Sequence, residues 1–523
     1  MWRLAKDAEI HQIQVTRKGF TPVPRTAARG HVLLRTVWVF TCKDSEPHKD
    51  GHTTLAFKAR LTARGDLVPK DKINPDQIHS PTIDTDMLRT CLAVVAGDPL
   101  SRYLAGDFKG AYLNAELDTK EDPVFVYVPD GMDGVPTGCV LQLHINLYGL
   151  CEAAWRWYME LSRTMLVLGW NRGVFDGCLW SRPDGDGHTY FLVHVDDTLS
   201  LGRNVDKHFA AIAAKYELRN LGIPTKWCGI EFEFLPKEII LHQRSYKTHF
   251  VERWRNDPVH PMTVEPHLSA LPQGTDLLNL AQLPAPDVLW YRKYCGEINW
   301  MQVTNPDLAP GSVHLFRGIG NTTALHAAAA QHMLGYISAH LDQGISFSRI
   351  RTGSVVPEMY VDAEFARNRR TGRSDQGSFI TIYDNPVAWS CEAQTSVAKN
   401  SYHAEIIAFS GGGEKLMKIR NYLSDLQIPI TQPSITYEDN RAVIRYGRDI
   451  GMARAARSLV IHFHYGRDLQ QQGYIDIRGV TSQDNKADFF TKLQGKEQFR
   501  SSCKGMHIVS LDERRAAATA VIG

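Results

Sequence analysis

The order of apolar and polar residues predicts strands and helices in the first half of the chain. TVWVF (36–40) and LAFKARLTARG (55–65) are strand-like runs on either side of the polar turn KDSEPHKDGH (43–52), which predicts a hairpin with Lys58, Arg60 and Arg64 on its returning limb. Apolar residues recur with helical spacing in 83–96. A second helix is predicted over 152–168, with one core-like face made of Ala154, Trp157, Tyr158, Leu161, Met165 and Leu168.

The second half of the chain changes its pattern twice. From residue 206 the sequence predicts amphipathic helices with short strands, and helical segments continue to about residue 345. The Pro-rich stretch SALPQGTDLLNLAQLPAPD (269–287) has no periodicity and is interpreted as a linker. After residue 357, strand-like runs such as MYVDAEF and SITYEDN are interleaved with predicted helices near 401–426 and 484–500, which indicates an α/β domain.

Composition and charge narrow the class of protein. The 523 residues are 43% hydrophobic and 22% charged, with no apolar run of membrane-spanning length and no apolar signal-peptide core at the start. The nine cysteines form no CxxC pair, so we expect reduced thiols and an intracellular protein. Residues 1–106 hold 16 Lys and Arg against 11 Asp and Glu, whereas residues 107–205 hold 7 against 14. This asymmetry suits a protein that binds phosphates with one part and metal ions with the next.

The stretch FLVHVDD (191–197) takes an apolar strand into two adjacent carboxylates. One interpretation is a hairpin turn, where Asp is common. The other is a divalent-metal site, because like charges side by side repel each other unless a cation lies between them. Asp107 also follows a strand-like run, so two neighbouring strands would bring it to the same sheet edge as Asp196 and Asp197. Three such carboxylates suit the paired magnesium ions of displacement at phosphorus.

Further motifs surround these acids along the chain. The first group is KARLTARG, HSPT, GDFKGAYLNAEL, LYGLCEAAWRWY, FLVHVDDTLSLG and LGIPTKWCGIEFEF. In order and spacing it resembles the reverse transcriptase of copia-type (Pseudoviridae-like) LTR retrotransposons. The resemblance continues through YRKYCGEINWMQVTNPDLA into a second group that is similar to the ribonuclease H domain of the same polyproteins: YVDAEFARNRRTGRSDQGSF, VAWSCEAQTSVAKNSYHAEIIAF, YEDNRAV and NKADFFTK. It covers about residues 36–500.

The resemblance implies roles for residues of the polymerase region. Asp107, Asp196 and Asp197 match the metal ligands. Tyr112 matches the aromatic gate against a ribose 2′-hydroxyl, with the small Ala111 beside it.

Four other residues match the nucleotide-binding positions of the family. Lys58 and Arg60 resemble the residues that grip the triphosphate, although exposed Lys and Arg side chains are often only solvated charges. Tyr148 and Gly149 fall in the segment that supports the template base and the nucleotide.

The second group of motifs implies a four-carboxylate ribonuclease H site. Asp362, Glu405, Asp439 and Asp488 match that set, with Glu405 on a helix and with Asp362 and Asp439 expected to end strands. Each acid alone could be a surface acid or a helix cap. Two Mg²⁺ per active site, or Mn²⁺, are the implied cofactors of both activities.

Several positions depart from the family pattern. His194 stands where Tyr is usual, and CEAA (151–154) brings Glu152 near the expected template path. SGGGEK (410–415) places three glycines in a predicted helix, which is expected to be weakened or broken. LVIHFHYG (459–466) is read as a strand, where His462 and His464 invite a metal interpretation beside that of ordinary packing.

Together these patterns predict an α+β right-hand polymerase followed by an α/β ribonuclease H-like domain. The expected parts are an N-terminal extension (1–35), fingers and palm (36–205), a thumb and connection (206–350), the ribonuclease H-like domain (357–500) and a C-terminal tail (501–523), of which ERRAAATAVIG (513–523) is interpreted as a frayed end. The chain shows no zinc knuckle, protease or integrase motif, so it looks like the polymerase–ribonuclease H portion alone.

The resemblance also implies partners and a location. The partners are an RNA template, a DNA primer, RNA–DNA hybrid, deoxynucleoside triphosphates and other polyprotein products such as integrase and capsid, with no membrane. The location is the cytoplasm, within a virus-like particle, and the nucleus. Two alternatives stay open: a decayed or domesticated nucleic-acid-binding remnant, and a polymerase whose ribonuclease H domain is disabled by the glycine run.

Overall fold

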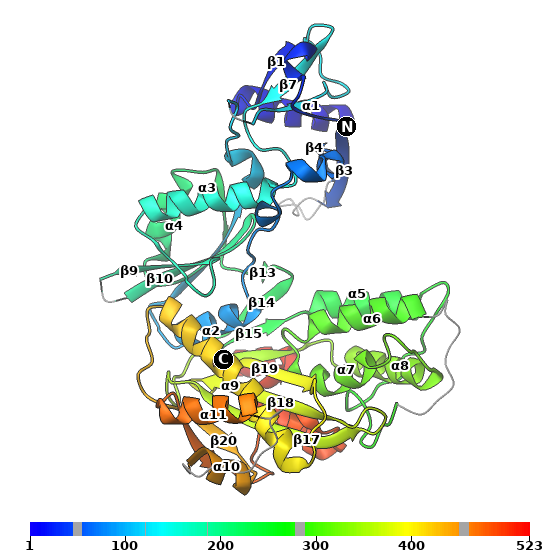
Figure 1. The fold of residues 1–523 in the computed structure, drawn as a ribbon, viewed down its shortest axis with the longest axis vertical. Coiled ribbons are helices and arrows are strands. Elements are labelled where there is room, and N and C mark those ends of the chain that lie inside the picture. The colour runs from blue at the N-terminus through cyan, green and yellow to red at the C-terminus, as the bar shows by residue number, and fades with distance from the viewer. Residues whose placement is uncertain (45–54, 121, 186, 278–287, 449–459, 523) are drawn as a thin grey trace.

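The fold was analysed in a computed structural model that describes residues 1–44, 55–120, 122–185, 187–277, 288–448 and 460–522. The fingers lie at the top of Figure 1, the palm below them, and the thumb and the ribonuclease H-like domain at the bottom. No helix in the described ranges is long and apolar enough to span a membrane.

The fingers contain a four-stranded sheet and the predicted hairpin. The sheet has the order β1-β7-β6-β2, and its strands are β1 (Phe20–Pro24), β2 (Val32–Leu34), β6 (Val124–Val126) and β7 (Cys139–Leu143). The hairpin pairs β3 (Thr36–Asp44) with β4 (Leu55–Ala63), and most of its predicted turn lies outside the described residues.

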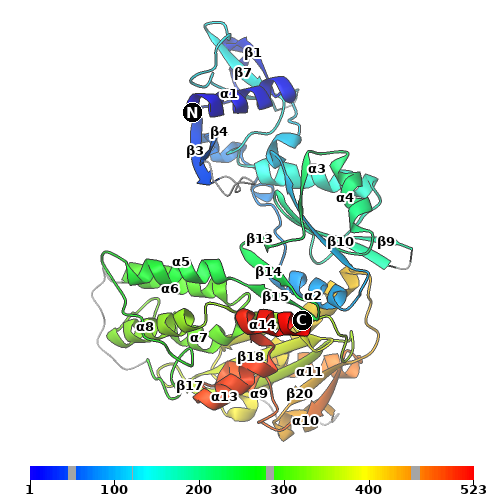
Figure 2. The same cartoon turned by 180° about the vertical axis from the view of Figure 1, so that it is seen from behind.

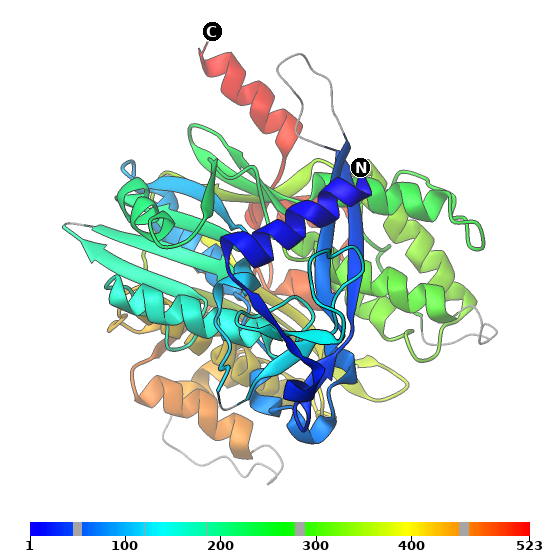
Figure 3. The same cartoon turned by 90° about the horizontal axis from the view of Figure 1, so that it is seen from above.

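Residues 1–35 are packed into the fingers and do not form a separate extension. Helix α1 (Trp2–His11) lies across the hairpin in Figure 3 and contacts β4. Ile13, Phe20 and Leu34 share one apolar core with Leu61 of β4. Burial of these side chains explains why the segment is ordered against β4, although its sequence carries none of the motifs.

The palm is a six-stranded antiparallel sheet that carries the acid motif. Its order is β12-β5-β11-β10-β9-β8, and its strands are β5 (Arg102–Phe108), β8 (Asn171–Arg172), β9 (Leu179–Asp184), β10 (Gly187–His194), β11 (Asp197–Gly202) and β12 (Leu218–Gly222). Alternation along β10 sends Phe191 and Val193 to one face and Tyr190 and Leu192 to the other.

Helices cover both faces of the palm sheet. Phe191 and Val193 pack under α3 (Ala153–Val167) and α4 (Val205–Ala213), as the predicted apolar face of 152–168 requires. Tyr190 and Leu192 pack on α2 (Thr85–Ala96). All of the residues 87–96 of α2 are buried, because its opposite side contacts the C-terminal domain.

The thumb region combines helices with a five-stranded sheet. The helices are α5 (Arg244–Arg255), α6 (Val288–Met301), α7 (Ala309–Phe316) and α8 (Ala324–Ala339). The sheet has the order β13-β14-β15-β16-β22, with strands β13 (Lys226–Trp227), β14 (Ile230–Phe234), β15 (Glu238–His242), β16 (Gln343–Ser348) and β22 (Ile508–Ser510). Of the predicted linker, Ser269, Ala270 and Leu271 are buried, and residues 278–287 lie outside the described ranges.

The interpretation of residues 513–523 as a frayed end is wrong for the described part, because residues up to 522 form a helix. Strand β22 pairs with β16 and completes the thumb sheet. Helix α14 (Leu511–Ile522), labelled in Figure 2, follows it. Arg515 lies 2.6 Å from Glu233 of β14, and Arg244 lies 2.8 Å from Asp512. The pairing requires a strand about 165 residues upstream, since Gln343 pairs with Ser510 and Ile345 with Ile508, and local sequence patterns do not reveal such a partner.

The C-terminal domain has a mixed five-stranded sheet of the ribonuclease H type. The order is β19-β18-β17-β20-β21, with β17, β18 and β19 antiparallel and with β17, β20 and β21 parallel. The strands are β17 (Glu358–Asn368), β18 (Arg373–Ile382), β19 (Asn385–Ala393), β20 (Ser434–Glu438) and β21 (Ile475–Gly479). The helices are α9 (Ser401–Asp425), α10 (Arg441–Arg448), α11 (Val460–Gln471), α12 (Asp488–Thr491) and α13 (Lys496–Gly505).

Two local predictions for this domain are wrong. Helix α9 is 25 residues long and continues through the glycine run 411–413 without a break. A Cβ at Gly412 would lie 2.5 Å from Val361 Cγ1, so the glycine lets α9 pack closely on β17. Tertiary packing therefore outweighs the low helix propensity of glycine. Residues 460–471, read as a strand at their start, form helix α11.

Helix α2 joins the palm to the C-terminal domain. Arg89 of α2 donates to the carbonyl oxygens of Val387 (2.8 Å) and Val303 (2.9 Å), stacks over Trp389 and pairs with Asp86. Figure 1 shows α2 next to α9, and the two helices are in contact.

The C-terminal half of α9 completes this junction. Lys418 lies 2.7 Å from Asp84 and 2.9 Å from Asp86, and Asp425 accepts hydrogen bonds from the backbone N–H groups of residues 174–176. The palm, thumb sheet and C-terminal domain accordingly share one apolar core.

Candidate active sites

The acid motif of the palm lies at a tight hairpin turn. His194 pairs with Asp197 across the β10–β11 hairpin, which leaves Val195 and Asp196 as the two turn residues. Val195 has a φ of 61°, a left-handed conformation that is strained for a β-branched residue. The indole N–H of Trp157 donates to the Val195 carbonyl oxygen at 2.8 Å and holds the turn in place. The hairpin interpretation is thus correct for the backbone and leaves the metal interpretation open.

The third acid joins this turn through strand pairing. Asp107 is the register partner of Asp197 on β11, and the N–H of Phe108 donates to the Asp196 carbonyl oxygen at 2.8 Å. All three acids are half-buried and line one cleft of about 640 Å³. The prediction that neighbouring strands bring them to one edge is confirmed.

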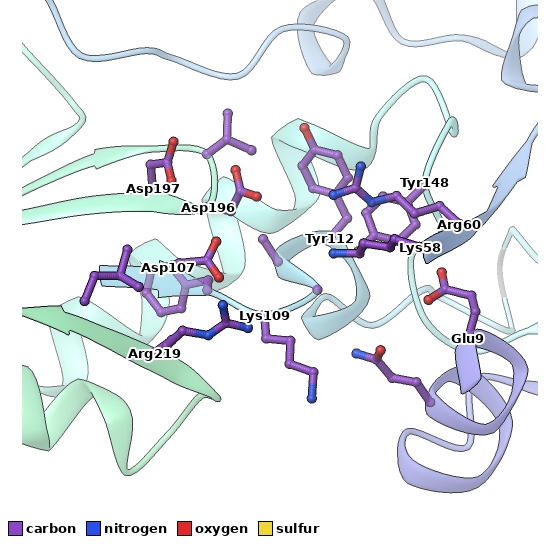
Figure 4. A pocket seen from close by; sticks show the side chains of 16 residues that line it. Glu9, Lys58, Arg60, Asp107, Lys109, Tyr112, Tyr148, Asp196, Asp197 and Arg219 are labelled. Atoms are coloured by element: carbon purple, nitrogen blue, oxygen red, sulfur yellow. The ribbon is translucent and has the colours of Figure 1, made fainter. Parts of the chain in front are cut away.

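Basic and aromatic residues form the other wall of the cleft. Lys58 and Arg60 come from one face of β4, and Figure 4 shows them beside Tyr112 and Tyr148, across the cleft from Asp107. The rings of Tyr112 and Tyr148 lie 5.8 Å apart, and the Arg60 guanidinium lies 5.6 Å from the Tyr148 ring centre. Burial raises the pKa of Tyr148 to about 12, so its hydroxyl stays protonated.

The two small residues of the predicted set lie in different places. Ala111 lines the cleft next to Tyr112. Gly149 is not among the lining residues: its φ is 83°, and a Cβ there would lie 2.2 Å from the Ala63 carbonyl oxygen. Its own carbonyl accepts a hydrogen bond from Gly65 N–H at 3.1 Å. Gly149 therefore ties the cleft floor to the end of β4 and does not contact the cleft itself.

Sequence reasoning missed three charged residues of this cleft. Glu9 of α1 is 7% exposed, and its carboxylate accepts from Leu61 N–H on β4. Burial raises its pKa, and Lys58 and Arg60 oppose that rise. Lys109 and Arg219 line the acidic side, where Arg219 is a register partner of Asp107. Lys109 lies in a quoted motif, but only the fold shows that α1 reaches the cleft.

The ribonuclease H-like domain holds a second cluster of acids. Ligand oxygens of Asp362 (β17), Glu405 (α9) and Asp439 (directly after β20) all lie within 4.8 Å of one another. Asp362 is the fifth residue of an eleven-residue strand, so the expectation that it ends a strand is wrong. The parallel pairing of β17 with β20 brings Asp362 and Asp439 together.

The electrostatics of this cluster favour a cation. Burial raises the pKa of Asp362 to about 6, and burial with the nearby Glu438 raises that of Glu405 to about 10. Glu405 Oε2 is buried, and no described donor bonds to it. Several carboxylates that share one buried space with an unsatisfied oxygen are a donor set suited to Mg²⁺ or Mn²⁺.

Asp488 is not part of this close group. Its Oδ1 pairs with Lys492, and its Oδ2 accepts from Gln494 at 3.4 Å. Lys492 also lies 3.8 Å from Asp362, whose Oδ2 accepts from the Thr491 hydroxyl. Thr491 and Lys492 belong to the quoted NKADFFTK motif, so the sequence held a signal for them that was not used.

Two other neighbours of the cluster were also missed. Glu438 is fully buried beside Asp439, and its Oε1 accepts from Asn440 N–H at 2.9 Å. Ser482 donates to Asp439 Oδ2 at 2.5 Å. The YEDN motif contains Glu438, whereas only the fold brings Ser482 to the site.

Three residues that depart from the family pattern, Glu152, His462 and His464, have identifiable local surroundings. Glu152 pairs with Arg156 at 2.5 Å, which offsets its charge. His462 lies 3.1 Å from the Ser410 hydroxyl on α9. His462 and His464 lie two apart on a helix, where side chains do not face each other, and the close acid group of the described residues includes neither.

These two arrangements define the class of protein: a right-hand polymerase joined to a ribonuclease H-like domain. Residues 26–264 match a family model described as reverse transcriptase (RNA-dependent DNA polymerase). Over 521 residues the chain is 26% identical to the retrovirus-related Pol polyprotein from transposon RE2 of Arabidopsis thaliana, covering 98% of this chain and 34% of that protein.

Two further matches are a tobacco Pol polyprotein and a solved viral structure. Over 498 residues the chain is 24% identical to the Pol polyprotein from transposon TNT 1-94 of Nicotiana tabacum, covering 92% of this chain and 36% of that protein. A solved structure of the foamy viral protease-reverse transcriptase in complex with double-stranded DNA aligns with 85% of this chain and 67% of that chain, at 10% identity and a TM-score of 0.45.

Residues 26–264 therefore belong to the reverse transcriptase family, and over nearly its whole length the chain is similar to retrotransposon Pol polyproteins. It spans about a third of the length of the curated relatives it matches. The predicted family and fold class are confirmed.

Proposed function

We propose that this chain synthesises DNA on RNA and DNA templates and cleaves the RNA strand of RNA–DNA hybrids. The observation that carries the first activity is the cleft in which Asp107, Asp196 and Asp197 lie across from Lys58 and Arg60. Acids on one wall and bases on the other suit a magnesium-bound triphosphate, which must meet both kinds of group.

Each wall of the polymerase cleft then has its own task. Asp107, Asp196 and Asp197 would hold Mg²⁺, which supplies activation of the primer 3′-hydroxyl and neutralisation of the leaving pyrophosphate. Lys58 and Arg60 bind and orient the triphosphate. Tyr112, next to Ala111 in the cleft, blocks a ribose 2′-hydroxyl and so selects deoxynucleotides.

Primer extension on an RNA template with magnesium tests this activity. We expect extension by the wild-type chain and loss of extension in Asp196→Asn. Asp206→Asn is the matched control, because the Asp206 side chain is 71% exposed at the start of α4 and lies outside the cleft. A folded, template-binding protein that extends no primer would favour the alternative of a nucleic-acid-binding remnant.

The close group of Asp362, Glu405 and Asp439 supports the ribonuclease H activity. These carboxylates would hold the divalent ions that activate water against the RNA strand. Hydrolysis of a labelled hybrid is expected for the wild-type chain and is expected to be lost in Glu405→Gln. Glu414→Gln removes an exposed carboxylate from the same helix and should cleave normally.

A hybrid that stays intact while primer extension proceeds would support the alternative of a disabled ribonuclease H domain. The glycine run gave rise to that alternative, and the continuous α9 removes its structural basis. RNA template, DNA primer, hybrid and deoxynucleoside triphosphates are the proposed partners, and a cytoplasmic particle and the nucleus are the proposed locations.

A further inference from the structure

The ribonuclease H site contains an ammonium group of its own. The Lys492 Nζ pairs with Asp488 Oδ1 and lies 3.8 Å from Asp362 Oδ2. Its side chain is 42% exposed, whereas those of Asp362 and Asp488 are 3% and 10% exposed. The lysine thus reaches in from the open side of the site and places a positive charge between two buried carboxylates.

The contacts of Asp488 explain why it stands apart from the other three acids. Lys492 pairs with one oxygen of Asp488 and the Gln494 side-chain amide donates to the other, and Gln494 Oε1 accepts from the Ser502 hydroxyl at 2.8 Å. Asp362 is held from the same segment by the Thr491 hydroxyl. The four-carboxylate set is therefore divided into a close group of three and a fourth acid that a lysine neutralises.

We propose that Lys492 is a positioning residue that acts as an internal counter-cation, occupying the Asp362–Asp488 side of the site until a divalent ion displaces it. This inference rests on the proposed ribonuclease H function. An ammonium and a divalent ion repel each other and compete for the same carboxylate oxygens, so only one of them binds there at a time.

The competition makes the two halves of the site unequal. The group of Asp362, Glu405 and Asp439 takes its ion without moving Lys492. An ion that uses Asp488 must first break the Lys492–Asp488 pair. The coupling is reciprocal: the Lys492–Asp488 pair weakens ion binding by the same free energy by which the bound ion weakens the pair.

Amine labelling of the wild-type full chain tests the displacement without any substitution. The chain is treated with an amine-acetylating reagent in EDTA and in saturating Mg²⁺ or Ca²⁺, and modified lysines are quantified by mass spectrometry. We expect labelling of Lys492 to rise severalfold with the ion. Lys415 of α9 is the internal control: it pairs with Glu392 of β19 at 2.9 Å, and its side chain is 32% exposed. Its labelling should be the same in both conditions. Equal labelling of Lys492 in both conditions would overturn the proposal.

Ion binding by a variant gives the second test. Mn²⁺ titration is followed by calorimetry in full chains that carry Asp196→Asn, so that the polymerase cleft contributes little. The Lys492→Met chain should bind the ion that uses Asp488 about tenfold more tightly, because the substitution removes a positive charge next to that ion. Lys492→Arg retains the charge and should keep the affinity within a fewfold of wild type, and Lys415→Met should match wild type.

The outcomes separate this inference from the proposed function. If Mn²⁺ binds and Glu405→Gln abolishes binding, while Lys492→Met leaves the affinity unchanged, then only the role of Lys492 is wrong. If the Asp196→Asn chain binds no ion, the metal-dependent function is contradicted and the inference fails with it.

Discussion

The polymerase cleft and the ribonuclease H site accommodate their acids differently. In the cleft, Asp107 on β5 and Asp196 at the β10–β11 turn are half-buried, and Lys58 and Arg60 lie across an open space. In the C-terminal domain the acids are packed together, and burial raises the pKa of Asp362 to about 6.

The difference shows two ways to keep carboxylates ready for divalent ions. An open cleft leaves its acids in partial contact with water and presents the cations of Lys58 and Arg60 on the opposite wall. A closed cluster lowers its net charge through raised carboxyl pKa values and through the ammonium group of Lys492. The open site is suited to a substrate that brings its own negative charge. The closed site is suited to divalent ions that bind before any substrate does.

The largest expected effect is the separate loss of each activity when one acid of the corresponding site is substituted. Asp196→Asn should lower primer extension by about a thousandfold, the upper range for loss of one group that stabilises developing charge. It should leave hybrid cleavage unchanged, and Asp439→Asn should show the reverse pattern. Both rates are measured on the same preparations. Loss of both activities in either variant would mean that the sites are not separable.

The junction that α2 makes between the palm and the C-terminal domain should contribute to the stability of both regions. Arg89→Met removes a guanidinium that is 5% exposed and leaves two carbonyl oxygens without their donor. We expect unfolding to become easier by about 3 kcal/mol, the low end for a broken buried ion pair. Arg102→Met is the control: its ion pair with Asp206 is exposed and 4.0 Å long, so the change should be at most about 0.5 kcal/mol. Thermal unfolding monitored by circular dichroism measures both.

The closed cluster should make the metal-free protein sensitive to pH. Carboxyls with raised pKa values, such as Asp362 at about 6, bind protons more tightly in the folded state than in the unfolded state. The contribution of Asp362 to stability is therefore fully present below its unfolded pKa near 4 and is lost as the pH rises through the folded value, a change of up to about 3 kcal/mol. The melting temperature in EDTA should decline from pH 5 to pH 8.

Glu405 should contribute to the same decline, because its pKa is raised to about 10. Glu405→Gln should flatten the profile, and Mg²⁺ should restore stability at high pH. A profile of the same slope in Glu405→Gln would show that the buried cluster is not its source.

The smallest effect is expected from the packing of α9. Gly412→Ala places a Cβ 2.5 Å from Val361 Cγ1, next to Asp362 on β17, and should destabilise the fold by about 1–2 kcal/mol. Gly296→Ala on α6 has open space and should instead stabilise the fold by up to about 1 kcal/mol. Urea unfolding compares the two, and Gly412→Ala should slow hybrid cleavage more than primer extension. A stabilising Gly412→Ala would show that α9 does not need this close approach.

Patterns along the sequence predicted most elements of both regions. Alternation predicted the β3–β4 hairpin, and helical spacing predicted α2 and α3 close to their observed bounds. The reading of 459–466 as a strand failed because apolar and polar residues alternate there by chance, within a segment that packs as a helix on α9. The glycine run misled because propensity describes an isolated helix, and α9 is held by its neighbours.

The sequence by itself determined which residue types are present and their order: three palm acids, four ribonuclease H acids and the motifs around them. The tertiary structure decided which of them meet. It brought Glu9 of α1 to the polymerase cleft, left Gly149 out of it, and separated Asp488 from the other acids through Lys492. It also placed β22 beside β16. These contacts join segments far apart in the chain, and the packing that forms them depends on shape and burial rather than on local periodicity.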